Sequence, residues 1–233
     1  MSGPPSNALY VQYGCGLSAP DGWVNFDTSP TLLIERLPLV GPLLAKRLVG
    51  FPASVRVGDI RKGLPLPNGS VQGLYASHVI EHLTYEDAKQ AFVVSIALLR
   101  PGGTFRLVVP DLTARAERYL KSFASGDIKA AEGLLDGTGL GRRRKRGGLL
   151  GVLTQALGNS DHLWMWDELS MSSALHEAGF ADVRRCSFGD SDDAMFALVE
   201  DEERFQDGGS PELAFECRRP IIESGPGGKR ADR

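Results

Sequence analysis

Cysteine is scarce in this sequence. Only Cys15, Cys186 and Cys217 occur among 233 residues. They are too few and too scattered for a disulfide framework or a zinc cluster, and they favour a reducing, cytoplasmic setting. The first residues, MSGPPSNA, have neither the basic start nor the apolar core of a signal peptide. No uninterrupted apolar run approaches the ~20 residues that a membrane span requires.

A large excess of charge is also missing. The formal net charge is −3, which argues against a dedicated nucleic-acid-binding protein, and we expect no nucleic-acid partner. Hydrophobic residues make up 42% and charged residues 24% of the chain, as in ordinary globular proteins. The length therefore predicts one sizeable α/β domain.

Predicted strands and helices alternate along the chain. Aromatic and β-branched residues predict strands, and apolar residues at helical spacing predict helices. The strands are expected at 8–14, 23–27, 54–59, 71–80 and 104–112, with closing strands at 181–189, 194–201 and 213–220, and the helices at 85–100, 112–126 and 167–180. Such alternation favours a Rossmann-like, mostly parallel seven-stranded sheet with helices on both faces. Asp167 is a plausible N-cap and Gly179 a plausible C-cap of the last helix.

Domain boundaries follow from composition. We expect a flexible N-terminus over residues 1–7, one domain over 8–220 and a disordered tail over 221–233. The apolar stretch 30–51 is helical in pattern but is interrupted by Pro38 and Pro42. It predicts two short helices, or a helix and a loop.

The predicted strand tips carry the informative residues. Open parallel sheets bind ligands beyond the carboxyl ends of their strands. The tips are Gly14-Cys15-Gly16, Asp27, Asp59, Ser77-His78 and Pro110-Asp111. A single surface acid means little, but acids at successive tips of one sheet indicate a binding site.

These tips suit an adenosine. Glycines let the backbone approach a ligand closely. Asp27 can accept hydrogen bonds from both hydroxyls of a ribose, and Asp59 from an adenine amino group, while Ile60 covers the ring. The dinucleotide fingerprint needs a third glycine opening a helix, with an acid about 20 residues further on. Gly16 is followed by LSAPDGW, which leaves no room for a full helix. An adenosine that carries a sulfonium amino acid therefore fits better than one that carries a pyrophosphate.

Several motifs together resemble a known family. YGCGLSAPDGWVNFD, VGDIRKGLPLPNGSVQGLYASHVIEHL, LLRPGGTFRLVVPDL and DHLWMWDELSMSSALHEAGFADVRRCSFG resemble the class I S-adenosylmethionine-dependent methyltransferases, in particular a small bacterial branch. The resemblance spans roughly residues 8 to 220. It departs from the family in the first crossover, where the usual helix is missing or much shortened. It implies a methyltransferase whose cofactor is S-adenosylmethionine, with S-adenosylhomocysteine as the product.

The resemblance also implies roles for individual residues. Gly14, Cys15 and Gly16 would line the methionine part of the cofactor, Asp27 would hold the ribose, and Asp59 and Ile60 would bracket the adenine. Ser77 and His78 would lie beneath the cofactor, near the transferred methyl group. The complete set of expected cofactor contacts is Tyr13, Gly14, Cys15, Gly16, Asp27, Thr28, Gly58, Asp59, Ile60, Ser77 and His78.

The segment HVIEH, residues 78–82, offers a rival interpretation. H-x-x-E-H is the inverted zincin motif, in which two histidines bind zinc and a glutamate acts as base. A third zinc ligand would be needed, and no clear candidate appears downstream. We therefore favour a histidine that touches cofactor or substrate, and we predict no metal site.

The acceptor is expected to meet the protein at SDHLWMWDE, residues 160–168. Histidine is the natural general base for a hydroxyl. His162 is the first choice, His82 the second and His78 the third. Asp111, Trp164 and Trp166 are the predicted acceptor contacts, although core packing of the two tryptophans is an equally good interpretation.

The stretch 121–160 is predicted to form a mobile lid. It contains the basic run 142–146, which favours a solvated loop or contact with an anionic acceptor. Two functions stay open at this point. One is methyl transfer to oxygen or nitrogen of a small molecule, a sugar or a lipid-linked intermediate. The other is a cofactor-binding partner or regulatory protein without transfer activity.

Overall fold

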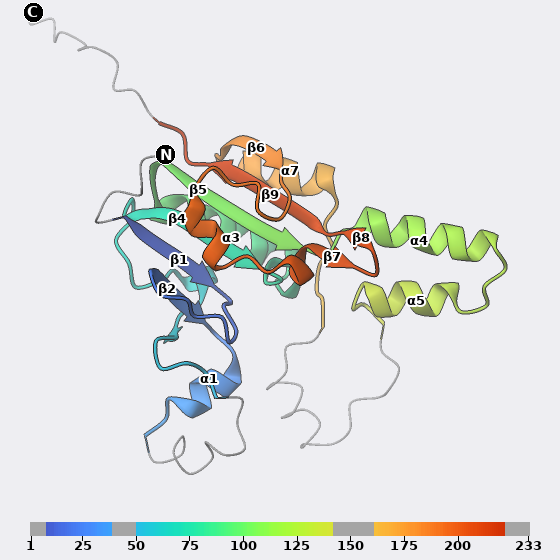
Figure 1. Ribbon diagram of the computed structural model, residues 1–233, viewed down its shortest axis with the longest axis horizontal. Coiled ribbons are helices and arrows are strands. Elements are labelled where there is room, and N and C mark those ends of the chain that lie inside the picture. The colour runs from blue at the N-terminus through green and yellow to red at the C-terminus, as the bar shows by residue number, and fades with distance from the viewer. Residues whose placement is uncertain (1–7, 39–49, 142–160, 222–233) are drawn as a thin grey trace, which may run out of the picture.

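A seven-stranded sheet forms the centre of the molecule in the computed structural model, which describes residues 8–38, 50–141 and 161–221 (Figure 1). Its strands, in the spatial order β3-β2-β1-β4-β5-β9-β6, are β1 (Leu9–Tyr13), β2 (Trp23–Asp27), β3 (Arg56–Val57), β4 (Val71–Ser77), β5 (Leu99–Val109), β6 (Ala181–Arg185) and β9 (Leu213–Arg218). β1 to β5 pair in parallel, whereas β9 runs antiparallel to β5 and β6. The predicted Rossmann-like, mostly parallel seven-stranded sheet is confirmed. A separate hairpin joins β7 (Gln206–Asp207) to β8 (Ser210–Pro211).

Two different layers cover the faces of the sheet. The α-helices are α1 (Pro30–Glu35), α3 (Tyr85–Leu98), α4 (Leu112–Ala124), α5 (Ala130–Gly137) and α7 (Glu168–Glu177). The 3₁₀-helices are η1 (Ile60–Lys62), η2 (Ile80–His82), η3 (Ala194–Leu198) and η4 (Glu202–Phe205). α3 and α7 pack on one face, where alternate residues such as Val11, Leu74 and Phe105 form the main core. In the described residues, η3 and η4 cover the other face, while α4 and α5 extend away from the sheet (Figure 1).

The closing strand predicted over 194–201 is wrong. Residues 194–198 form η3, and Asp193 caps it by accepting a hydrogen bond from the Met195 amide. Phe196 is fully buried, and its ring lies 5.5 Å from that of Trp23 and 6.5 Å from that of Tyr75. The place beside β5 is occupied by β9, so this segment crosses the sheet face and does not join the sheet.

Local signals place most helix ends. Thr84, Asp111 and Asp167 each cap a helix by accepting backbone N–H bonds, and Asp167 forms a capping box with Ser170. The predicted N-cap Asp167 is therefore confirmed. α7 ends at Glu177 and its C-cap is Ala178, so the predicted C-cap Gly179 is wrong by one residue; Gly179 follows the cap with φ 96°.

The helix predicted over 85–100 ends two residues early, before the segment PGG. α3 ends at Leu98, and residues 101–103 belong to β5. A Cβ at Gly103 would lie 2.9 Å from the Arg100 carbonyl oxygen, so the glycine permits a tight corner at the start of β5.

The first crossover is as short as the sequence predicts. β1 ends at Tyr13 and β2 begins at Trp23, with no helix between them. The buried Gln12 amide holds this loop, because its nitrogen donates to the Ser18 carbonyl oxygen (2.9 Å) and to Asn25 Oδ1 (2.6 Å). Parallel strands commonly need a dozen or more residues between them, and these internal hydrogen bonds allow a shorter connection here.

A buried arginine ties the covering segment to the sheet. Arg106 of β5 has a side-chain exposure of 1%, and it pairs with Asp190 (3.0 Å), Glu200 (2.6 Å) and Glu216 (2.7 Å). Its guanidinium also donates to the Ser187 carbonyl oxygen at 3.0 Å. One cation therefore satisfies carboxylates from three parts of the chain.

Replacement of Arg106 by methionine is expected to lower the free energy of unfolding by about 3–5 kcal/mol, because it leaves the buried Glu200 carboxylate without its counter-charge and removes one of two arginine partners from Glu216. Arg118→Met is the matched control. Arg118 pairs with Asp207 at the surface, where the side chains are 41% and 39% exposed, and the expected loss is below about 1 kcal/mol. Urea unfolding measures both. Equal stability of Arg106→Met and the unmodified chain would contradict the assigned role.

Candidate functional site

A pocket of about 510 Å³ opens at the carboxyl ends of β1, β2 and β4. Pockets for small ligands typically span roughly 300–1,000 Å³. The lining residues are Tyr13, Gly14, Asp27, Thr28, Ser29, Pro30, Gly58, Asp59, Ile60, Arg61, His78, Val79, His82, Leu83 and Leu163. Most of the cofactor contacts predicted from the sequence therefore meet in one cavity.

Asp27 is fixed in this pocket by backbone amides. Its exposure is 7%. Oδ2 accepts a hydrogen bond from the Gly16 amide at 2.9 Å, and Oδ1 accepts one from the Ser29 amide at 2.7 Å. Each oxygen keeps a further lone pair. The carboxylate is thus held in one orientation and can still accept bonds from a ligand's hydroxyl groups.

Asp59 has a partner that the sequence did not predict. The Arg61 side chain donates to both of its oxygens, at 2.9 Å from Nε and 2.8 Å from Nη2, and the Arg61 amide donates at 3.1 Å. These hydrogen bonds lower the pKa of Asp59. Much of its accepting capacity is therefore used inside the chain. A contact with an adenine amino group, predicted from the sequence, would have to share the carboxylate with Arg61.

The glycine turn packs closely against the next strand tip. Gly14 has φ 64°, and a Cβ there would collide with the side chain of Val79. Gly16 has φ 55° with open space around it. Burial raises the pKa of the Cys15 thiol to about 12, so this cysteine is a packed side chain and not a reactive thiol. Cys15, Gly16 and Ser77 support the pocket without lining it.

His78 is held in place at both ring nitrogens. Nε2 lies 2.9 Å from the Arg204 carbonyl oxygen, and Nδ1 lies 3.3 Å from Glu81 Oε1. Burial lowers the pKa of His78, but the Glu81 carboxylate and the Arg204 carbonyl outweigh it, and the net pKa is raised. The residue also has φ 54°, which is uncommon for a side chain other than glycine. An imidazole whose two ring nitrogens both have partners is a poor general base.

His82 and His162 come together from distant parts of the chain. Their ring centroids are 5.0 Å apart, and His82 lines the pocket beside Leu163. Burial lowers the pKa of His162. The Leu163 and Trp164 amides donate to the Glu81 carbonyl oxygen, at 2.7 and 3.2 Å. These two bonds bring the 161–166 segment to the pocket.

The three predicted acceptor contacts have different surroundings. Trp166 is fully buried, and its ring packs against Tyr85 and Phe92. Its predicted contact with an acceptor is therefore corrected: it belongs to the core. Trp164 is 42% exposed next to Tyr85. Asp111 caps α4 and does not line the pocket.

The inverted zincin interpretation does not fit the local structure. That motif needs an α-helix to place both histidines on one face. Residues 80–82 form only a 3₁₀ turn, and both ring nitrogens of His78 already have partners. His78 and His82 are therefore not a pair of zinc ligands.

A second pocket of about 600 Å³ lies between β6, η4 and the β7–β8 hairpin. Its lining residues are Arg185, Cys186, Ser187, Phe188, Glu202, Phe205, Gln206, Gly209, Pro211 and Glu212. It contains none of the residues predicted from the strand tips, and it lies away from the carboxyl ends of β1 and β2. The pocket of about 510 Å³ is therefore the better candidate for the functional site, because the predicted strand-tip residues line it.

Comparison with known families identifies the domain. Residues 23–107 match the family model described as a methyltransferase domain. This match covers β2, η1, β4 and most of β5, and thus the strand tips that carry Asp27, Asp59 and His78. The chain contains a class I S-adenosylmethionine-dependent methyltransferase domain. The predicted family and enzyme class are confirmed, and S-adenosylmethionine is the cofactor of such a domain.

The chain is also similar to several solved structures. An S-adenosylmethionine-dependent methyltransferase from Archaeoglobus fulgidus is 12% identical, with 91% of this chain and 86% of that chain covered and a TM-score of 0.45. A Burkholderia thailandensis 1,6-didemethyltoxoflavin-N1-methyltransferase, solved with S-adenosylhomocysteine, is 14% identical, with 92% and 72% covered and a TM-score of 0.44. No curated protein matches the chain.

The pocket residues of this methyltransferase domain fit its cofactor. The oriented Asp27 carboxylate suits ribose hydroxyls, and the buried Ile60 supplies an apolar surface for a flat base. Gly14 has no Cβ, so only its backbone lies beside the cavity, at a position where a Cβ would collide with Val79. Among the described residues, no helix has the length and apolar character to cross a lipid bilayer.

Several lining residues were not predicted from the sequence. Ser29 and Pro30 follow Asp27 directly, where α1 begins, and this position was a usable signal. Val79 and Leu83 flank η2. Leu163 and Arg61 had no signal in the sequence. Leu163 is placed by the hydrogen bond from its amide to the Glu81 carbonyl oxygen. Arg61 is placed by its side-chain pair with Asp59.

Gly14→Ala is expected to weaken binding of S-adenosylhomocysteine at least tenfold, because the new Cβ pushes Val79 or the β1 turn into the cavity. Gly69→Ala is the matched control. Gly69 has a similar φ of 70° but open space around it, and it does not line the pocket. Both variants carry the backbone cost of about 1–2 kcal/mol. Titration calorimetry should show a loss of affinity only for Gly14→Ala, and equal affinities would exclude the close contact as the cause.

Proposed function

We propose that this methyltransferase domain transfers the methyl group of S-adenosylmethionine to an oxygen or nitrogen atom of a small-molecule, sugar or lipid-linked acceptor. The main support for this proposal is the Asp27 carboxylate, which the Gly16 and Ser29 amides orient at the edge of the pocket. A carboxylate held in this way accepts the vicinal hydroxyls of a ribose and has no use for a phosphate, which would be repelled.

Methyl transfer needs no covalent bond between the protein and the methyl group. The acceptor atom attacks the methyl carbon in line with the sulfonium sulfur, the new bond forms as the carbon–sulfur bond breaks, and S-adenosylhomocysteine leaves with the electron pair. Alignment and exclusion of water supply much of the acceleration. Leu83 and Leu163 give the pocket apolar walls on the His82 side, and this end suits the reacting groups.

The polar groups at this end can remove the acceptor proton. His82 lines the cavity, and His162 stands behind it with its ring centroid 5.0 Å away. His78 is unsuited, because its ring nitrogens face Glu81 and the Arg204 carbonyl. We therefore assign deprotonation of the acceptor to the His82–His162 end, with Trp164 as the exposed ring nearest to an entering acceptor.

An anionic acceptor was suggested by the basic run 142–146, which lies outside the described residues. Of the lid predicted over 121–160, the described part is the end of α4, then α5 and its C-terminal turn. The cytoplasmic setting is likewise a prediction from cysteine scarcity alone.

Asp27→Asn is expected to weaken S-adenosylhomocysteine binding about tenfold or more. An amide offers one acceptor oxygen where the carboxylate offers two, so the Gly16 or Ser29 amide loses its partner and the ribose loses an anion. Asp21→Asn is the control, since Asp21 is exposed in the same crossover. Calorimetry with both variants tests the assignment. Unchanged affinity in Asp27→Asn would remove the ribose role.

His162→Ala is expected to lower turnover by about 10²–10⁴-fold while leaving S-adenosylhomocysteine affinity unchanged, because His162 does not line the cofactor pocket. Release of S-adenosylhomocysteine in the presence of fractionated cell metabolites measures turnover. A chain that binds the cofactor but never releases product with any fraction would support the alternative, a binding or regulatory protein.

A further inference from the structure

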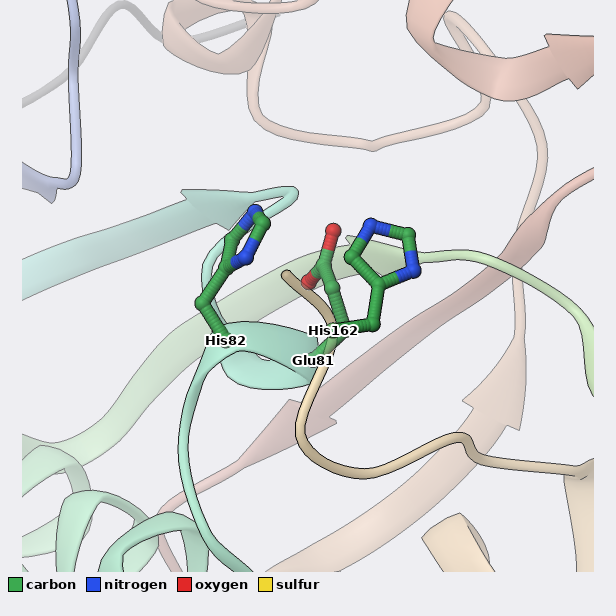
Figure 2. A group of neighbouring side chains, drawn as sticks. All are labelled: Glu81, His82 and His162. Atoms are coloured by element: carbon green, nitrogen blue, oxygen red, sulfur yellow. The ribbon is translucent and has the colours of Figure 1, made fainter. Parts of the chain in front are cut away.

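Three side chains with metal-binding atoms meet beside the cofactor pocket. Glu81 and His82 come from η2 and His162 from the segment before α7, and one ligand atom of each lies within 4.8 Å of those of the other two. Figure 2 shows the Glu81 carboxylate between the two imidazole rings, with all three side chains directed to the same side. Two nitrogens and one carboxylate oxygen on one side is a common donor set for transition-metal ions.

The Glu81 carboxylate is buried without hydrogen bonds. Its side-chain exposure is 1%, and neither Oε1 nor Oε2 has a hydrogen-bond partner among the described residues. Oε1 lies 3.3 Å from His78 Nδ1, an ion-pair distance without hydrogen-bond geometry. Oε2 has no ion-pair partner in the described part of the chain. Burial of a carboxylate is costly unless its lone pairs are satisfied. Glu81 therefore needs a partner that the described residues do not supply.

The two histidines are set up to present lone pairs. Nδ1 of His82 lies 3.1 Å from the Asp161 carbonyl oxygen, and Nδ1 of His162 lies 2.8 Å from the Thr138 carbonyl oxygen. A carbonyl oxygen only accepts, so each Nδ1 carries the proton and each Nε2 carries a lone pair. Histidines that bind metals commonly donate their other N–H to a backbone carbonyl in this way.

The surrounding backbone holds the cluster in place. The Leu163 and Trp164 amides donate to the Glu81 carbonyl oxygen, which fastens the segment that carries His162 to η2. Gly139 has φ 65°, and a Cβ at that position would lie 2.8 Å from the His162 ring. The ring therefore depends on a glycine at the end of α5. Three separate parts of the chain, namely η2, residues 161–164 and residues 138–139, therefore hold the cluster together.

We infer that Glu81, His82 and His162 bind one divalent first-row transition-metal ion, of which zinc is the representative. Metal–ligand distances of about 2.0–2.2 Å bring the donor atoms of a tetrahedral site to roughly 3.3 Å from one another. The ligand atoms now lie within 4.8 Å of one another, so metal binding requires side-chain rotations that bring them closer. Three protein ligands leave at least one position open for a water molecule or an acceptor oxygen.

This set differs from the one that the HVIEH motif suggested. There His78 would be a ligand and Glu81 the base. Here Glu81 is a ligand, His78 is its neighbouring counter-charge, and His162 is the missing third ligand from 80 positions downstream of His82. The sequence offered no sign of it, because only the fold brings the two segments together.

The role of the ion in catalysis rests on the proposed methyl transfer, whereas its binding does not. A metal ion beside His82 would hold an acceptor hydroxyl and lower its pKa, so that the proton leaves to solvent and the oxygen attacks the methyl carbon. This chemistry favours oxygen acceptors over amines. It also gives His82 and His162 a function as ligands in place of direct proton transfer.

Metal binding can be measured on the full, untagged chain after treatment with EDTA and removal of the chelator. We expect Zn²⁺ to bind with a stoichiometry of one in calorimetry, and Co²⁺ to give a visible absorption band typical of nitrogen and oxygen ligands. Glu81→Gln, which keeps the side-chain volume, and His162→Gln should each lower Zn²⁺ affinity at least tenfold. His176→Gln is the matched control, because His176 is exposed on α7 and bonds only within its own helix.

The outcomes separate this inference from the proposed function. No stoichiometric Zn²⁺ binding by the unmodified chain, or equal binding by a folded Glu81→Gln variant, would overturn the metal site. Circular dichroism of each variant establishes that it is folded. S-adenosylhomocysteine is titrated into the same samples. Zn²⁺ binding without S-adenosylhomocysteine binding would leave the metal site standing and remove the methyltransferase proposal, and the reverse result would do the opposite.

Discussion

The candidate site depends on the Asp27 carboxylate, which accepts hydrogen bonds from two backbone amides. The Gly16 amide belongs to the loop after β1, and the Ser29 amide belongs to the turn that starts α1. One carboxylate therefore joins the ends of two neighbouring parallel strands. The loop between these strands has no helix to stiffen it. Without the carboxylate, the Gly14–Gly16 turn would lose the contact that shapes the floor of the pocket.

The opposite side of the pocket depends on a second backbone anchor. The Glu81 carbonyl oxygen accepts bonds from Leu163 and Trp164, so a short turn after β4 holds a segment that follows much later in the chain. The same turn contributes His82 to the wall and the buried Glu81 side chain behind it. In the function proposed above, the ribose contact at the end of β2 and the acceptor end after β4 would therefore lie on different strands.

Much of this architecture could be predicted from local sequence patterns, that is, from residue types close together in the chain. Aromatic and β-branched residues predicted β1, β4 and β5, and Asp167 predicted the start of α7. Asp111, which was predicted as an acceptor contact, caps the start of α4. The rule that ligands bind beyond strand ends correctly predicted that Asp27, Asp59 and His78 share one pocket. These features depend on neighbours in the chain or on the general geometry of parallel sheets, and both can be deduced from residue order.

What could not be predicted depends on contacts between distant residues. Phe196 turns a strand-like segment into η3 because it fits among the aromatic rings of the sheet face. Trp166 looks like a binding residue, but it fills the core between Tyr85 and Phe92. The Arg61 pair with Asp59 and the approach of His162 to Glu81 have no local signature. In each case the competing physical cause is tertiary packing or a side-chain pair that residue order does not reveal.

The central claim is that the strand-end pocket, and not the larger cavity near β6, holds the adenosyl cofactor. Chemical-shift mapping on ¹⁵N-labelled protein tests it most directly, because glycine amides mark both places. Addition of S-adenosylhomocysteine should shift the Gly16 and Ser29 signals, whose N–H groups bond to Asp27. The Gly209 signal, in the larger cavity, should stay unchanged. Shifts confined to the region of Gly209, or none at all, would contradict the account.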